Sequence, residues 1–468
     1  MAEPHHEVPD SAREQGHGGR LLFAGCAAGS MFGYSIAVSN NAVEPLRQRF
    51  ALSAVAEGVV VSALTAGALA GCVAAGRTAD RFGRRSVLGA AGLLALFGTL
   101  LAAGAMNVVT LVTARFLLGA AVGITSSVTP MFLAELGPAH LRGTLVTSYQ
   151  LAVAAGNLLS LGAGAALSVG DHWRLMFVCN ALPALGQISA ILAIRERPGP
   201  RLHPSVASLN PASRRHTISN PRRRKGSATL PWASRPAAIA MAAALMNALV
   251  GVGAVVYYST PVFGIAGVGG WIGAQIATLS VGLVNVLASV VALHLIQRHG
   301  RRSLLSVGLA GIILALVTAG VGLLTPPFAL TGAITVAALL AFMACYAFSA
   351  GPVAWLLVAE VLPEEGRART AATATGLNWA ANLMVTLLFP IVVGSPGTPD
   401  RVGTTLLFFA ALSTGFLLYV RLRVPETRNR PLGQLNEDEH VGGRTRRHQP
   451  SDTSGKERHD QAADELGR

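Results

Sequence analysis

The sequence predicts an all-α polytopic membrane protein whose twelve transmembrane helices form two pseudo-symmetric six-helix halves. Three observations support this fold class. Apolar residues make up 51% of the 468 residues and charged residues only 13%, which is unusual for a soluble protein. Ten long stretches contain no Asp, Glu, Lys or Arg. Several features of the first half recur in the second half in the same order, as in a duplicated unit.

Each uncharged stretch is long enough to cross a bilayer, which takes about 20 apolar residues. The stretches cover residues 21–43, 58–76, 86–114, 116–134, 143–170, 175–194, 236–297, 303–359, 370–399 and 402–420. Two have double length and contain turn signals, Gly267, Gly269 and Gly270 in the first and Pro326 and Pro327 in the second. Splitting them gives twelve spans. Helices are expected because every backbone amide in hydrocarbon must bond internally.

Polar segments divide the chain into five parts. Residues 1–19 are expected to form a disordered N-terminal tail, and residues 425–468 a disordered C-terminal tail. Residues 20–195 form the first six-helix bundle and residues 236–424 the second. A basic linker, residues 196–235, connects the two bundles.

The distribution of basic residues predicts the orientation in the membrane. Alternate loops, at 77–85, 135–142, 195–235, 298–302 and 367–369, hold 20 Lys and Arg residues. The opposite loops hold four, Arg47, Arg49, Arg174 and Arg401. Because basic loops stay in the cytoplasm, both termini are expected there, in a plasma membrane or bacterial inner membrane. The net charge of +14 then faces anionic membrane lipid. We expect no nucleic-acid partner, since no basic face is interleaved with aromatic residues.

The sequence argues against an enzyme and against bound cofactors or metals. A phosphate-binding loop needs its lysine after a Gly and before a Ser or Thr, and neither Lys225 nor Lys456 meets both conditions. His5 and His6 lie in the polar N-terminal tail, where solvent exposure is the simpler explanation.

Internal repetition points to transport. The loop at 76–85 recurs at 297–302, and the Glu135 to Arg142 spacing recurs from Glu360 to Arg367. The segment at 195–198 corresponds to that at 424–427. Two packed repeats with a substrate site near the bilayer midplane are typical of alternating-access transporters. A monomer is the expected functional unit.

Together these segments resemble the sugar porter family of the major facilitator superfamily over nearly all of residues 20–430. The resemblance rests on the loop at 76–85, residues 134–143, Tyr257-Tyr258-Ser259-Thr260, Gly351-Pro352-Val353-Ala354-Trp355 and Pro425-Glu426-Thr427. It implies a membrane transporter of a sugar or similar polyhydroxylated small molecule.

Charged residues at the helix ends form a candidate latch that favours one of two rocking states. They are Asp80, Arg84, Arg85, Glu135, Arg142, Glu360 and Arg367. In the family, charges at these positions are held to bridge the halves when the transporter is open to the outside. The alternative is that they only set the orientation. Gln297 stands where the family usually has an acid, so the second-half latch is expected to be weaker.

Amide side chains within apolar helices are candidates for sugar binding, because they both donate and accept hydrogen bonds. They are Gln150, Asn247, Asn285, Asn378 and Asn382, and their alternative role is helix–helix hydrogen bonding. The resemblance implies sugar contact for Gln150, Asn285 and Asn378 and ring stacking for Trp355. Trp379 is as easily explained by packing between helices.

The seventh helix departs from the family. Asn247-Ala248 stands where relatives usually have a pair of glutamines, and Gly253 where an asparagine follows. At least two amides are therefore missing, which leaves the identity of the ligand open.

The positions of the acidic residues predict facilitated diffusion. All 23 carboxylates lie in tails, loops or at helix ends, so no acid is available for a proton relay at the midplane. Proton-coupled relatives have Asp after the Phe-Gly-Tyr segment, where this chain has Ser35, and the matching Arg115 lacks its partner. Two alternatives stay open: a proton symporter that uses His294 or another relay, and a non-transporting nutrient sensor.

Overall fold

The computed structural model describes residues 10–138, 141–167, 172–194, 234–325, 330–362, 367–394 and 397–426. The side chains of residues 10–17, 142 and 367–369 fall outside this description. The described part is helical and contains no strand. Twelve of its segments are long and apolar enough to cross a membrane, as the sequence predicts.

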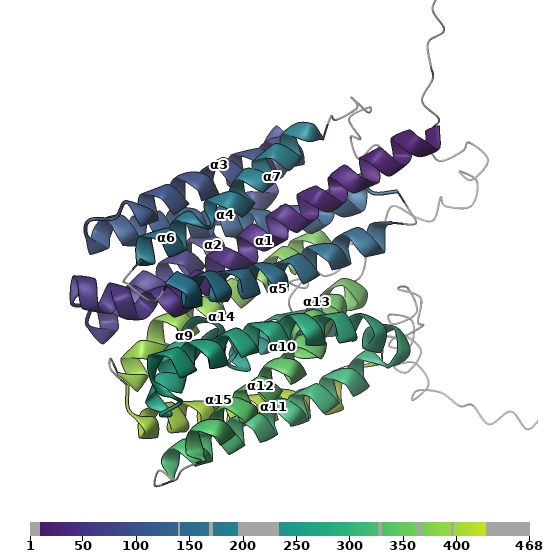
Figure 1. Ribbon diagram of the computed structural model, residues 1–468. Helices are drawn as coiled ribbons and strands as arrows, with labels where there is room; N and C mark the ends of the chain where they lie inside the picture. The colour runs from purple at the N-terminus through teal and green to yellow at the C-terminus, as the bar shows by residue number, and fades with distance from the viewer. Residues whose placement is uncertain are drawn as a thin grey trace, which may run out of the picture. The chain divides into compact units, whose positions relative to one another are not determined.

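The first half contains seven helices (Figure 1). They are α1 (Asp10–Phe50), α2 (Ala54–Phe82), α3 (Arg84–Ala103), α4 (Val108–Leu136), α5 (Arg142–Leu167), α6 (Trp173–Val178) and α7 (Ala181–Ala193). Because α6 and α7 together make one span, this half contributes six.

The second half contains eight helices and also contributes six spans. They are α8 (Arg235–Leu249), α9 (Val252–Ile265), α10 (Gly270–Arg298), α11 (Arg301–Leu324), α12 (Thr331–Phe348), α13 (Ala350–Val361), α14 (Arg367–Val393) and α15 (Pro399–Arg423). The predicted turn at 267–270 is present, with positive φ angles at Gly267, Gly269 and Gly270. The predicted turn at Pro326 and Pro327 lies outside the described residues.

The helix α1 begins at Asp10, ten residues before the predicted start of the first bundle. Its first turns contain Ala12, Arg13, Glu14 and Gln15, which favour helices, and an acid at the start is favourable to the helix dipole. Polarity alone did not distinguish this helical extension from a disordered tail. Most of the predicted linker and residues 427–468 lie outside the described residues.

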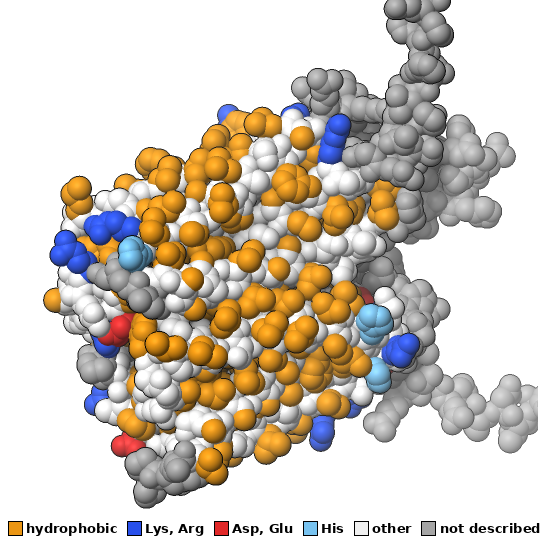
Figure 2. All heavy atoms as spheres, in the orientation of Figure 1, with side chains coloured by type: hydrophobic (Ala, Val, Ile, Leu, Met, Phe, Trp, Pro, Cys, Tyr) orange, Lys and Arg blue, Asp and Glu red, His pale blue; other side chains and the backbone are white. Residues whose placement is uncertain are grey.

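The bundle has two opposite sides, which we call the Phe50 side and the Gly83 side. The Phe50 side is the one where α1 ends and α2 begins, and the Gly83 side is the one where α2 meets α3. Between them, Figure 2 shows a face covered by hydrophobic side chains, with charged side chains gathered toward the two ends. Large exposed side chains of this kind include Phe97, Leu182 and Leu314. Such an apolar surface fits a lipid environment.

Glycines bring α2 and α4 into close contact. A Cβ atom on Gly67 would lie 2.0 Å from the carbonyl oxygen of Phe116, and one on Gly71 would lie 2.1 Å from that of Ala120. The arrangement is reciprocal, because Gly119 and Gly123 of α4 approach carbonyl oxygens of α2 to 2.0 Å by the same measure. Small residues spaced by four are the usual means by which membrane helices pack closely.

Two spans of the second half are broken near the middle. Between α8 and α9, Gly251 adopts a left-handed conformation with φ of 95°. Between α12 and α13, Ser349 has a non-helical conformation, two residues before the predicted break at Gly351-Pro352. Pro352 is tolerated there because the first turn of a helix leaves its N–H groups unbonded within the helix.

The two halves meet along three pairs of helices, α1 with α9, α2 with α14, and α5 with α10. Figure 1 shows α5 of the first half alongside α10 of the second. In this last pair Gly282 of α10 packs against Leu158 and Leu161 of α5. These residues lie closer to the Phe50 side than Gln150 and Asn285 do, because α5 runs toward that side and α10 runs away from it.

Candidate functional site

Three of the predicted binding amides form a connected chain. Asn378 donates to the side-chain oxygen of Asn247 at 3.0 Å, and Asn382 donates to that of Asn378 at 3.3 Å. Asn378 also donates to the carbonyl oxygen of Ala244 at 2.9 Å. The chain therefore connects α8 with α14.

Asn247 also forms hydrogen bonds on both sides of the break in the tenth span, between α12 and α13. Its amide nitrogen lies 3.1 Å from both the Tyr346 hydroxyl and the Ala350 carbonyl oxygen, and 3.3 Å from the carbonyl oxygen of Gly351. Asn247 and Asn378 are buried, with 7% and 5% of their surface exposed. The Asn247 amide therefore ties the first turn of α13, directly after the break, to α8.

The other three predicted binding residues are accessible. Gln150 on α5 is exposed, while Asn285 on α10 and Trp355 on α13 are half-buried. The structure shows no contact that joins these side chains to one another. Their amide and ring surfaces are thus more accessible than those of Asn247 and Asn378.

Gly253 of α9, just after the break in the seventh span, faces Asn382 of α14. A Cβ atom on Gly253 would lie 3.4 Å from the side-chain oxygen of Asn382. The half-buried Asn382 thus borders the space that a longer side chain at position 253 would fill. Trp379 packs against Phe32 with ring centroids 6.0 Å apart and is only 6% exposed, so its place is between the halves.

A hydrogen-bond network between the halves lies toward the Phe50 side. Asn40 donates to the Val256 carbonyl oxygen at 2.9 Å and to the Ser259 hydroxyl at 2.7 Å, and it accepts from the Thr260 backbone N–H at 2.9 Å. Asn41 accepts from the Thr260 hydroxyl at 3.1 Å. Both asparagines are 1% exposed.

A further hydrogen bond between the halves joins Thr65 of α2 to Thr386 of α14, with hydroxyl oxygens 3.0 Å apart. We group it with the contacts of Asn40 and Asn41 as one network of contacts between the halves. These residues are not among the functional candidates that the sequence predicts. The signal was present, since Asn40 and Asn41 are two amides at the end of an apolar stretch.

Arg115 is a buried charge in the first half, with 1% of its surface exposed. Its guanidinium donates to the Val60 carbonyl oxygen at 2.9 Å and to the Ser39 hydroxyl, and it lies 6.0 Å from the centre of the Phe177 ring. One turn before Ser39, the Ser35 hydroxyl donates to the Met31 carbonyl oxygen at 2.7 Å and accepts from Asn180 at 3.0 Å. Ser35 therefore bonds to neutral groups, whereas Ser39 contacts the Arg115 guanidinium.

On the Gly83 side, two ion pairs of the described residues each join residues within one half. Arg84 pairs with Glu135 at 2.5 Å, and Arg301 pairs with Glu360 at 3.0 Å. The Glu426 carboxylate accepts from the backbone N–H groups of Arg301 and Arg302. It therefore occupies the N-terminus of α11, where a negative charge is favoured.

The other predicted latch residues have different surroundings. Arg85 donates to the carbonyl oxygens of Ile191 and Leu192, and Asp80 is exposed. The side chains of Arg142 and Arg367 lie outside the described residues, so their expected pairing with Glu135 and Glu360 stays a prediction.

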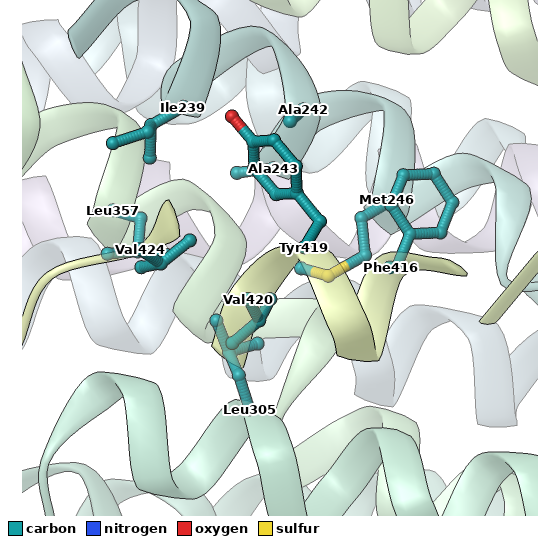
Figure 3. Close-up of a pocket in the computed structure, with 10 residues that line it drawn as sticks. All are labelled: Ile239, Ala242, Ala243, Met246, Leu305, Leu357, Phe416, Tyr419, Val420 and Val424. Carbon is teal, nitrogen blue, oxygen red and sulfur yellow. The ribbon is translucent and has the colours of Figure 1, made fainter. Parts of the chain in front are cut away.

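A small hollow, with room for about one water molecule, lies within the second half. Figure 3 shows side chains of α8, α11, α13 and α15 around it, among them Met246, Leu305, Leu357 and Tyr419. Its lining is almost entirely apolar, which does not suit a sugar. Among the described residues, no group of three His, Cys, Asp or Glu side chains could hold a metal ion.

Comparisons with known proteins agree with this architecture. The family model for sugar (and other) transporters matches residues 21–199 and 209–438. A D-xylose transporter of Levilactobacillus brevis is 30% identical over 441 residues, which cover 89% of this chain and 94% of that protein. The arabinose-proton symporter of Bacillus subtilis is 29% identical over 448 residues, with the same coverage of both chains.

A solved structure shows the same fold. The crystal structure of a D-xylose-proton symporter matches with a TM-score of 0.75 and 25% identity, covering 88% of this chain and 99% of the other. These similarities extend through both six-helix halves, and they are to membrane transporters, not enzymes. This chain is therefore a multi-pass membrane protein of the sugar (and other) transporter family, with the major facilitator fold.

Proposed function

We propose that this protein carries a sugar or a similar polyhydroxylated molecule across the membrane by facilitated diffusion and alternating access. Relatives named for arabinose, D-xylose and galactose support the substrate class. The accessible amides of Gln150 and Asn285 and the ring of Trp355 supply the hydrogen bonds and the flat apolar surface that a sugar requires.

The predicted site residues divide into two roles in this proposal. Gln150, Asn285, Trp355 and Asn382 contact the substrate, because their side chains are at least partly accessible. Asn247 and Asn378 act as positioning residues, because their amide groups are already bonded to each other and to the backbone at the break. Rigid support of this kind keeps contact residues in place.

Alternating access would use the contacts between the halves as a gate. With the Gly83 side in the cytoplasm, as the basic loops predict, the Asn40, Asn41 and Thr65 network closes the outer side. Its hydrogen bonds would break when the halves rock to open that side. The charged residues near Gly83 would help to close the Gly83 side when the Phe50 side is open.

The proposal of uniport rests on the placement of the acidic residues. In the described spans they lie within two turns of a helix end, and the middle of α1 holds Ser35, whose hydroxyl bonds to neutral groups. A proton relay at the midplane needs a titratable group there. Proton symport is the second candidate, because several relatives are named as proton symporters. It would require a group such as His294, which is exposed near the end of α10.

Counterflow in proteoliposomes tests the function and the coupling together. We expect the wild type to exchange labelled pentose or hexose without a pH gradient and to accumulate none when a gradient is imposed. The Ser35→Asp variant is expected to become pH-dependent, because it adds a buried carboxylate one turn from Ser39. A gradient of one pH unit supports at most about tenfold accumulation per proton carried.

The matched control is Ser35→Asn, which adds a polar group that does not titrate, and its exchange should remain independent of pH. Gradient-driven accumulation by the wild type would replace uniport with symport. If no saccharide exchanges at all, transport itself fails and the sensor alternative is favoured.

For Trp355→Ala, we expect the half-saturating sugar concentration to rise about tenfold, equal to about 1.4 kcal/mol of lost binding. The variant removes the flat face proposed to stack on the sugar, while Trp355→Phe retains part of it and should lose less. Concentration-dependent counterflow measures the change. Trp271→Ala is the control, because Trp271 is an exposed residue at the start of α10. An unchanged half-saturation in Trp355→Ala would exclude the stacking role.

A further inference from the structure

Arg115 has a positive charge that no described acid balances. The described ion pairs include Arg47 with Glu44, Arg84 with Glu135 and Arg301 with Glu360, and none of the described contacts of Arg115 is to an acid. Arg115 meets only neutral groups, the Val60 carbonyl oxygen, the Ser39 hydroxyl and the Phe177 ring. Arginine stays protonated in proteins, so the guanidinium remains cationic at this buried position.

The surroundings of Arg115 also contain unused hydrogen-bond donors. The Nη1 atom of Arg115 is buried and has no hydrogen-bond partner. The Ser39 hydroxyl accepts from Nη2 of Arg115, and its own proton goes to no described acceptor. Buried charged donors are normally paired, since leaving them unpaired costs much of their hydration energy. The two free donors, Nη1 of Arg115 and the Ser39 hydroxyl, together with the positive charge, favour an anion as the acceptor.

We propose that a small inorganic anion of the chloride class binds beside Arg115, held by Nη1 of Arg115 and the Ser39 hydroxyl. The anion supplies the counter-charge that a carboxylate would otherwise provide. It binds to the folded protein and is not transported with the sugar. This site is separate from the sugar-binding residues Gln150, Asn285 and Trp355, which lie on other helices.

Thermal unfolding of the purified full-length protein in detergent tests the proposal without any transport measurement. Sodium chloride is titrated against sodium gluconate at constant ionic strength. A ligand that binds only the folded state raises the apparent melting temperature with its concentration. We expect a saturable rise of several degrees with chloride.

The Ser39→Asp variant provides a built-in counter-charge, because the Ser39 hydroxyl already contacts Arg115. Its melting temperature in gluconate should be at least that of the wild type in saturating chloride, and chloride should add nothing. Ser39→Asn is the matched neutral variant and should still respond to chloride. An equal melting temperature of the wild type in both salts, or an undiminished chloride response in Ser39→Asp, overturns the proposal.

Bromide provides a second measurement, on the wild type alone, in case the Ser39→Asp variant does not fold. Crystals grown in bromide are expected to show an anomalous peak within hydrogen-bond distance of Nη1 of Arg115. A water molecule at that position, with no anomalous signal, would instead show that a neutral group satisfies the guanidinium and would overturn the anion site.

Discussion

Gly67→Ala is expected to lower the free energy of unfolding by about 3 kcal/mol, the upper end of the usual cost of overpacking. A methyl group at this position would lie 2.0 Å from the Phe116 carbonyl oxygen, which is far inside van der Waals contact. The opposing atom belongs to the α4 backbone and cannot rotate away, so α2 and α4 must separate. Loss of monodisperse protein in size-exclusion chromatography and a melting temperature lower by several degrees would measure the effect.

Gly76→Ala is the control for this substitution. Gly76 lies in the same helix, and a Cβ atom there would have nothing within 4 Å. It makes the same chemical change without the close approach, so its stability should match or slightly exceed that of the wild type. Equal melting temperatures for the two variants would show that α2 and α4 are not in close contact.

Asn40→Ala is expected to shift the protein toward the state that is open on the Phe50 side. The substitution removes three hydrogen bonds between the halves, each worth about 1 kcal/mol. In the open state water can replace them. The closed state therefore loses about 3 kcal/mol, which shifts the equilibrium roughly hundredfold.

Labelling of a cysteine at Thr386 measures this shift. Thr386 is fully buried within the network, so a thiol there reacts with a membrane-impermeant reagent only when the Phe50 side opens. In a background without the four native cysteines, Asn40→Ala should speed the labelling of Thr386→Cys. The control is Gln48→Ala, since Gln48 is on the same helix and its side chain bonds only to Glu44, within α1. Equal labelling rates would contradict a gating role for Asn40.

The number and placement of the spans could be predicted from the sequence because the membrane imposes a strong physical constraint. A stretch of about 20 uncharged residues has few alternatives to a transmembrane helix. The turn at 267–270 was predicted for a similarly local reason, since glycine readily adopts the positive φ angles found there.

Side-chain partners could not be predicted, because they depend on distances between helices far apart in the chain. Glu135 pairs with Arg84, 51 positions earlier, a pairing that the sequence did not indicate. Asn247 and Asn378 were correctly identified as unusual polar residues in apolar helices. Only the structure shows that their amides bond to each other and to the backbone, while Gln150 remains accessible.

The position of Glu426 has a practical consequence for protein engineering. Its carboxylate binds the first backbone N–H groups of α11, so the chain remains part of the folded unit after α15 has ended at Arg423. Purification tags and fluorescent fusions are therefore best attached downstream of this glutamate. A truncation that removes it would expose the start of a neighbouring helix and weaken the domain that the tag was meant to report on.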